Sequence, residues 1–139
     1  MKTKEQNYYG MYKVKTHLGP GPIIMGTDTL VANPIFNLQN ESLGKVYDIM
    51  LNMHTGRVAY VVLASGGYMG MGERLIPIPW DAMVLDTLKN RLTLDVNADQ
   101  LERAPSFQCG NWLNMADQIW ANRVHTYYNT KLYLDNIRL

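Results

Sequence analysis

The sequence predicts a small, mainly β domain that ends in an amphipathic α-helix, and three stretches carry this prediction. Residues 58–64 are rich in β-branched and aromatic side chains, which favour strands. Residues 91–96 alternate between apolar and polar side chains, as half-buried strands do. From residue 111 onwards the apolar side chains instead recur at helical spacing. A chain of 139 residues, 47% apolar and 18% charged, can bury such a core within one domain.

Residues 1–27 are polar, and we expect them to form an N-terminal arm that is partly flexible. Two consecutive Gly-Pro pairs at residues 19–22 disfavour both a helix and a central strand. The arm nevertheless carries apolar side chains, among them Tyr8, Tyr9 and Tyr12. It is therefore either a frayed tail or an arm that docks on its own domain or on a neighbouring molecule.

The compact domain is predicted to span residues 28–107. Residues 30–32 form a first short strand, which ends at an Asn-Pro pair. A longer strand covers residues 42–53, and the strand at 58–64 follows a three-residue loop that ends in Gly56. Such a loop suits a type I turn plus one left-handed residue, a conformation that glycine adopts at low cost. We therefore predict a β-hairpin.

Residues 75–80 are predicted to be an edge strand or a bent strand, because Pro77 and Pro79 remove two hydrogen-bond donors. A single turn follows at residues 81–83. In the strand at 91–96, the even-numbered residues are apolar and the odd-numbered residues are polar. Asn97 and Gln100 then match a capping box, which predicts a short helix that stops before Pro105.

Residues 108–139 are predicted to form a C-terminal helix and tail. Asn111 suits the N-cap position, and the helix is expected to reach Tyr128. Its apolar face comprises Trp112, Met115, Ala116, Ile119, Trp120, Val124 and Tyr127. Because such a helix is marginal alone in water, it must pack either on its own domain or on a second subunit.

Five motifs in this order resemble the PRC-barrel family: SLGKVYDI at 42–49, TGRV at 55–58 with YVV at 60–62, IPIPW at 76–80, LTLDV at 92–96 and APSF at 104–107. The resemblance implies a small, strongly bent antiparallel sheet that closes into a β-barrel. It also implies an adaptor that docks on larger assemblies and often self-associates. Members include the cytoplasmic part of the reaction-centre H subunit and the C-terminal domain of RimM, but neither specific role carries over.

The sequence predicts no catalytic, cofactor-binding or metal-binding residues. The glycines of the loop at 65–72 lead into an extended segment, whereas a phosphate site needs a helix N-terminus there. His17, His54 and His125 are not spaced as metal ligands, and we expect all three to be solvated. Cys109 lies about 20 Å from His125 along the predicted helix, too far for a nucleophilic pair.

Asp48 is expected to be an outward-facing polar residue of its strand. The alternative is a position inside the bent barrel, paired with Arg57 across the hairpin. Such a lone pair is more often structural than catalytic. We therefore assign Asp48 no chemical role.

The net charge is +1 and the basic residues are scattered, which disfavours binding to nucleic acid. The three tryptophans lack interleaved basic residues, so we interpret them as packing anchors. A single cysteine fits a reducing compartment. The sequence shows no signal-peptide pattern and no apolar run of about 18 residues, so we expect a cytoplasmic protein without a membrane span.

The leading functional hypothesis is a non-enzymatic protein–protein interaction module that forms a homodimer or higher oligomer and docks on an unidentified protein partner. The methionine-rich loop and the apolar helix face are the predicted contacts. They comprise Tyr68, Met69, Met71, Trp112, Met115, Ile119, Trp120 and Tyr127. Two alternatives remain: an accessory factor for ribosome or RNA maturation, and a small-ligand-binding or proton-relay protein with a pocket near Asp48 and the glycine loop at 65–72.

Overall fold

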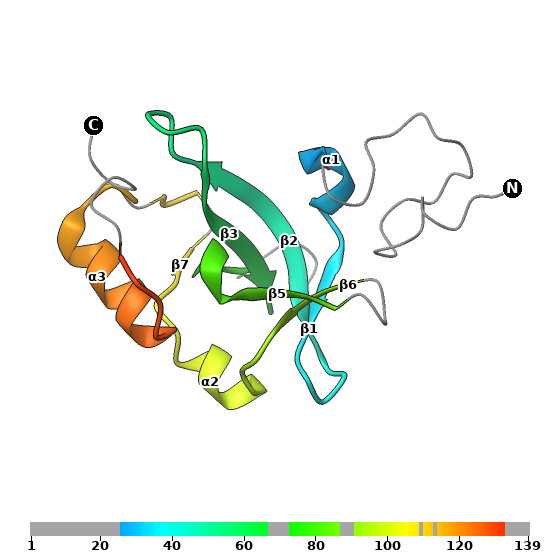
Figure 1. Ribbon diagram of the computed structural model, residues 1–139. Coiled ribbons are helices and arrows are strands. Elements are labelled where there is room, and N and C mark those ends of the chain that lie inside the picture. The colour runs from blue at the N-terminus through cyan, green and yellow to red at the C-terminus, as the bar shows by residue number, and fades with distance from the viewer. Residues whose placement is uncertain (1–25, 67–72, 87–90, 109, 113, 133–139) are drawn as a thin grey trace, which may run out of the picture.

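The computed structural model describes residues 26–66, 73–86, 91–108, 110–112 and 114–132 (Figure 1). Within these residues, seven strands form one mixed sheet in the order β5-β6-β1-β2-β3-β4-β7. The strands are β1 (Pro34–Phe36), β2 (Ser42–Leu51), β3 (Val58–Ser65), β4 (Arg74–Pro79), β5 (Met83–Asp86), β6 (Arg91–Leu94) and β7 (Phe107–Gln108). The helical elements are α1 (Thr27–Leu30), η2 (Trp80–Ala82), α2 (Ala98–Glu102) and α3 (Gln118–Tyr127). The predicted mainly β fold with a C-terminal helix is confirmed.

The sheet departs from the expected antiparallel barrel in two respects. β1 and β6 are parallel neighbours, with Phe36 opposite Thr93, whereas every other pair is antiparallel. The ladder is also open, because no pairing between β5 and β7 is found in the described segments. The sheet does bend: β2 is a long curved ribbon in Figure 1, and its pairing with β3 shifts between Val46 and Asp48 and between Met50 and Leu51. Such irregularities bend a strand and increase its twist.

The predicted β2–β3 hairpin is confirmed. Gly56 has a φ of 76°, and its N–H donates to the carbonyl of Asn52 at 2.8 Å. The Asn52 side chain also accepts hydrogen bonds from the N–H groups of His54 and Thr55. A polar side chain at the end of β2 therefore closes the turn that joins the two strands.

The first predicted strand, at residues 30–32, is wrong. The chain forms the short helix α1 there, followed by a turn in which Ala32 has a φ of 75°. The Asn33 side chain donates a hydrogen bond to the carbonyl of Thr29, which closes this turn. Local bonding by asparagine thus competes with strand pairing.

Pro77 and Pro79 lie in the part of β4 that has one partner strand, where a missing N–H leaves no ladder position unfilled on the other side. Every residue of β4 pairs with β3, whereas β7 pairs only with Arg74 and Leu75. Pro77 and Pro79 lie beyond that short pairing, where the described residues give β4 a single partner strand. This half of β4 is therefore the edge that the sequence predicted.

Hydrophobic side chains cover both faces of the sheet. Val61 and Leu63 of β3 face the main core, together with residues of β2, β4, β6 and α2. Val62, from the opposite face, packs with Leu75 and Phe107 in a second cluster. The β2–β3–β4 layer therefore supplies a buried surface on each side, and the second face carries the segments that follow α2.

The strand predicted at 91–96 is shorter and more buried than its alternation indicates. β6 ends at Leu94, and Thr93, expected on the outer face, is buried. Its hydroxyl donates to the carbonyl of Val84 at 3.1 Å. Val84 belongs to β5, a strand that the sequence did not predict, and pairing with β5 covers the threonine.

The predicted capping box of α2 is confirmed, because Asn97 and Gln100 each bond the other's backbone N–H at 2.8 Å.

The C-terminal helix is shorter than predicted. Asn111 does not cap it; α3 begins at Gln118, and the Asp117 side chain accepts a hydrogen bond from the N–H of Ile119 at 2.9 Å. Just before this cap, the Asn114 side chain accepts one from Ala116 at 3.0 Å. These two local bonds favour a turn over a helical path. Each helix in the described ranges is too short or too polar to cross a bilayer.

Candidate interaction surface

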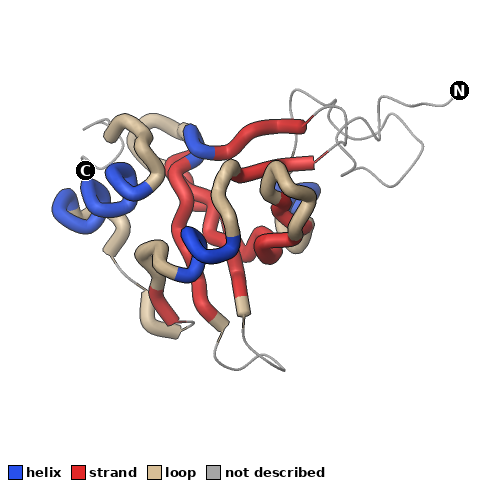
Figure 2. The backbone as a smooth tube through the Cα atoms, turned by 90° about the horizontal axis from the view of Figure 1, so that it is seen from below, coloured by secondary structure: helices blue, strands red, loops and turns tan. Residues whose placement is uncertain are grey.

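The predicted contact residues lie in separate places. Tyr68, Met69 and Met71 lie outside the described residues. Trp112 and Met115 precede α3, whereas Ile119, Trp120 and Tyr127 lie within it and point in different directions. The predicted single apolar face therefore does not form. Figure 2 shows α3 to one side of the strands, so that only part of the helix can face the sheet.

An exposed aromatic patch forms where the chain leaves β7. Trp112 packs on Phe107, with ring centroids 4.9 Å apart, and lies 6.2 Å from the ring of Tyr47 on β2. Trp112 is 41% exposed and Tyr47 is 39% exposed. Met50 and Met115 pack, half-buried, against the cluster that contains Phe107. We call Tyr47 and Trp112, with these two methionines behind them, the aromatic patch.

Sequence reasoning placed Trp112 and Met115 in the interaction surface but missed Tyr47. In a regular strand, Tyr47 would follow Val46 onto the opposite face and Asp48 would return to the core. The pairing shift between Val46 and Asp48 instead leaves both Tyr47 and Asp48 exposed. Asp48 therefore points outward, as predicted, and its carboxylate accepts a hydrogen bond from the N–H of Ile49 at 2.7 Å.

Trp120 is a packing anchor for α3. Its ring lies 5.6 Å from that of Tyr60 on β3, in an edge-on arrangement that aromatic pairs favour. The ring of His125 lies at the same distance from Tyr60. Burial raises the pKa of Tyr60 to about 12, and no described group hydrogen-bonds its hydroxyl. The second face of the sheet therefore holds α3 against the chain's own β3.

His125 is not solvated, contrary to the sequence prediction. It is only 5% exposed, and its Nδ1 lies 2.8 Å from the hydroxyl oxygen of Thr130. Desolvation lowers the pKa of His125, and the carboxylate of Asp81 offsets part of this effect. A cavity of about 290 Å³ borders the ring, and Arg57 and Asp81 also line it. The turn that follows α3 covers this position, where the sequence predicted a solvated side chain.

Ile119 lies on the exposed side of α3, away from the sheet, and its predicted role in a contact surface stays a prediction. It is 76% exposed, whereas Ala121, Val124 and His125 form the buried side. The helix begins only at Gln118. The contacts of Trp120 and His125 with Tyr60 fix its orientation on the sheet. The apolar spacing alone did not determine which side faces the sheet.

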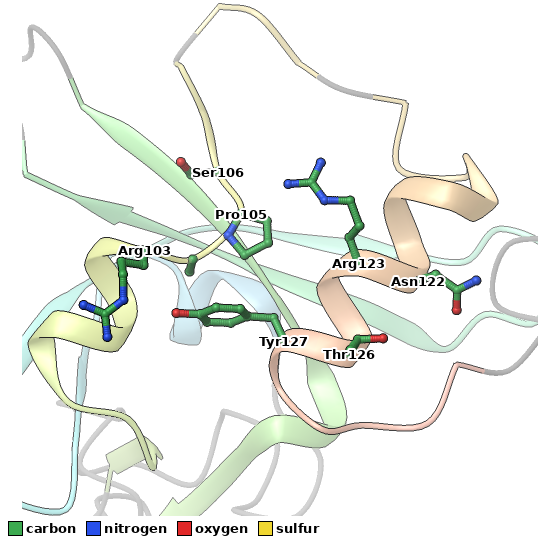
Figure 3. A pocket seen from close by; sticks show the side chains of 8 residues that line it. Arg103, Pro105, Ser106, Asn122, Arg123, Thr126 and Tyr127 are labelled. Carbon is green, nitrogen blue, oxygen red and sulfur yellow. The ribbon is translucent and has the colours of Figure 1, made fainter.

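Tyr127 lies in a groove of about 600 Å³ between α3 and the segment that follows α2. We call this the arginine groove; it is lined by Arg103, Ala104, Pro105, Ser106, Asn122, Arg123, Thr126 and Tyr127. In Figure 3, Arg103 comes from one wall and Arg123 from the other, with Pro105 and Tyr127 between them. The Tyr127 hydroxyl donates to the carbonyl of Gln100, which ties the two walls together.

Clustered reactive groups do not appear in the described segments. Among those residues, no three His, Cys, Asp or Glu side chains come together as metal ligands would. Cys109 and His17 lie outside the described residues. Asp48 does not line the arginine groove or the cavity at His125. The arrangement presents an aromatic surface and a cationic groove, both of which suit recognition by contact.

Comparison with known proteins identifies the family. The model of the PRC-barrel domain matches residues 24–101. This chain belongs to the PRC-barrel domain family. A comparison with curated proteins gives no match. The resemblance found in the sequence is thereby confirmed.

The aromatic patch extends across the end of the PRC-barrel match. Tyr47 lies within the matched residues, whereas Trp112 and α3 follow them. The arginine groove also begins after the match, because its first lining residue is Arg103. The arginine groove is thus lined entirely by residues beyond the PRC-barrel match, whereas the aromatic patch combines residues from within the match and after it.

Acidification is expected to destabilise this protein through His125. Because the pKa of the buried imidazole is lowered from its usual 6.5, the unfolded chain binds a proton at this residue more readily than the folded chain. Stability contributed by His125 is present above about pH 6.5 and is lost as the pH falls through the lowered pKa. Circular dichroism melting from about pH 7.5 to about pH 5 should show a falling Tm, and His125→Gln should flatten that dependence.

His54 provides the matched control for this prediction, because it is exposed in the β2–β3 turn. His54→Gln should keep the pH dependence of the wild type. Arg57, Asp81 and Tyr60 surround His125 and are unchanged in both variants. A Tm that falls as steeply in His125→Gln as in the wild type would assign the effect to other groups.

Proposed function

We propose that this protein is a non-catalytic PRC-barrel module that self-associates and docks on a larger assembly through its aromatic patch. PRC-barrel domains are generally non-catalytic, which supports a role in binding. Family membership also implies that the bent sheet closes into a barrel, and we take this as the architecture of the module. The observation that carries the proposal is the half-exposed Tyr47–Trp112 pair, supported from behind by Phe107.

Composition and burial of the patch support a protein contact. Tyrosine, tryptophan and methionine are enriched at the centres of protein interfaces, where large side chains leave water. Trp112 is already held by Phe107, so it loses little freedom on binding. The neighbouring Lys45 and Asp48 are exposed and supply a polar rim.

A second copy of the chain is the first occupant that we propose. In a two-fold contact the same patch meets itself, so each aromatic side chain can cover its counterpart on the other molecule. The exposed Lys45 and Asp48 carry opposite charges next to the patch, and they can pair between two antiparallel copies. Self-association therefore requires no surface other than the aromatic patch and the two charged residues beside it.

Sedimentation velocity over a range of micromolar concentrations tests self-association. The wild type is expected to shift from monomer to dimer as its concentration rises, and Trp112→Ser is expected to weaken the dimer at least tenfold. Loss of a buried aromatic contact at an interface centre commonly costs about 2 kcal/mol, which corresponds to that factor or more. Tyr47→Arg is a second variant that leaves the Trp112–Phe107 contact in place.

Leu38→Ser is the control, because Leu38 is exposed in the turn between β1 and β2, away from β7 and α3 (Figure 1). It should dimerise as the wild type does. Circular dichroism spectra establish that each variant is folded. A wild type that stays monomeric throughout contradicts self-association, and unchanged dimerisation of both patch variants contradicts the assigned surface.

A further inference from the structure

We propose that the arginine groove binds an acidic peptide segment of a protein partner. This proposal names a second contact of the docking module and rests on that proposed function. Arg103 and Arg123, one on each wall, supply the positive charge, and Pro105 and Tyr127 supply the apolar surface between them.

The two guanidinium groups are available to a ligand. Both side chains are exposed, and within the described part of the chain neither guanidinium makes a hydrogen bond or an ion pair. The eight lining residues include two cations and no carboxylate. An arginine presents five N–H donors in a planar fork that matches a carboxylate. The groove therefore offers unpaired positive charge on both sides of a potential ligand.

The walls are held in place before any ligand arrives. Arg74, from β4, donates to the Ser106 hydroxyl at 3.1 Å and to the carbonyls of Leu101 at 3.4 Å and Ala104 at 3.1 Å. These bonds fix the segment that forms one wall. The Tyr127 hydroxyl donates to the carbonyl of Gln100 and fixes α3 to α2, directly before that segment. A ligand therefore meets preformed walls, and the ordering cost is confined largely to the two exposed arginine side chains.

The size and lining of the groove favour a peptide over other anions. A volume of about 600 Å³ exceeds what a single phosphate or carboxylate fills, and it lies in the range of ligand pockets. Ser106, Asn122 and Thr126 can donate to peptide carbonyls and accept from peptide N–H groups. A nucleic acid strand would need a longer row of basic residues to neutralise successive phosphates.

NMR titration of the ¹⁵N-labelled full chain tests the proposal. The probe is an acetylated and amidated tetraglutamate peptide, and the matched control probe is tetraglutamine. Tetraglutamate is expected to shift the backbone amide signals of Arg103, Ser106, Arg123 and Thr126 to saturation, whereas tetraglutamine is expected to leave them unchanged. Raising the salt concentration should weaken the binding, because exposed charges are screened.

Arg103→Gln and Arg123→Gln are each expected to raise the Kd for tetraglutamate at least fivefold, and the double substitution is expected to abolish saturation. Arg57→Gln, an exposed arginine outside the groove, should bind as the wild type does. Because all three side chains are exposed, the spectra should otherwise keep the dispersion of the folded wild type. Unchanged binding in both groove variants would overturn the assignment.

Two further probes give outcomes that also overturn the proposal. Inorganic phosphate that saturates the same signals at concentrations no higher than tetraglutamate would indicate a small-anion site. Oligouridylate that binds more tightly than tetraglutamate would indicate an RNA site. No response to tetraglutamate would likewise contradict the binding of an acidic peptide. The arginine variants are expected to sediment as the wild type does. A failure of the peptide proposal is therefore distinguishable from a failure of self-association through the aromatic patch.

Discussion

Gly44→Ala is expected to destabilise the protein by about 3 kcal/mol or more. Gly44 lies in β2 with a φ of +143°, which L side chains rarely adopt. A Cβ built there would lie 2.3 Å from the carbonyl oxygen of Ala64 on β3. Because Ala64 belongs to the β2–β3 ladder, its backbone cannot move without disturbing that pairing. Urea unfolding followed by circular dichroism measures the loss in free energy of unfolding.

Gly56→Ala separates the steric cause from the conformational one. Gly56 also has a positive φ, 76°, but no atom lies within 4 Å of a Cβ built there. Its substitution should cost only the strain of the left-handed conformation, about 1 kcal/mol. If the two variants lost equal stability, the close approach of β2 and β3 at Gly44 would not be the cause.

The sequence predicted those parts of the fold that neighbouring residues determine. The β2–β3 turn depends on Gly56 and on the side chain of Asn52, four residues before it. The cap of α2 depends on Asn97 and Gln100, three residues apart. Because these interactions close over a short stretch of chain, the residue types alone indicate them.

The sequence did not predict the parts that depend on distant strands. The alternation in β6 predicts that Thr93 points outward. In the structure β5 pairs with β6, and the Thr93 hydroxyl donates a hydrogen bond to the carbonyl of Val84. The parallel contact of β1 with β6 likewise joins segments far apart in the chain. Alternation of residue types identifies a strand and its two faces, but it does not reveal which neighbour covers each face.

The candidate site was predicted in part for the same reason. Trp112 and Met115 were placed together because they are close in sequence, although the helix assumed to join them begins later. Tyr47 joins them only through the irregular pairing of β2. The arginine groove brings Arg103 and Arg123 from two separate helical segments to one hollow, so sequence spacing gives no signal for it.

Ile76→Ala is expected to lower the free energy of unfolding by about 3 to 4 kcal/mol. Ile76 lies in β4 opposite Leu63 of β3, and its side chain is fully buried in the main core. Removing three methylene-sized groups there loses their transfer free energy and leaves a cavity in the main core, which the surrounding side chains can close only partly. Urea unfolding again provides the measurement, with the slope of the transition as a check that the unfolded state is unchanged.

Ile119→Ala makes the same chemical change at an exposed site and should alter stability by less than about 0.5 kcal/mol. The apolar spacing of the sequence placed Ile119 in a face that packs on the domain or on a second subunit. In the structure, α3 is held by Trp120 and His125, with Ile119 turned away from the sheet. The comparison therefore tests the orientation of α3 as well as the core. A loss in Ile119→Ala approaching that in Ile76→Ala would mean that α3 packs with its other side toward the sheet or that a second subunit covers it.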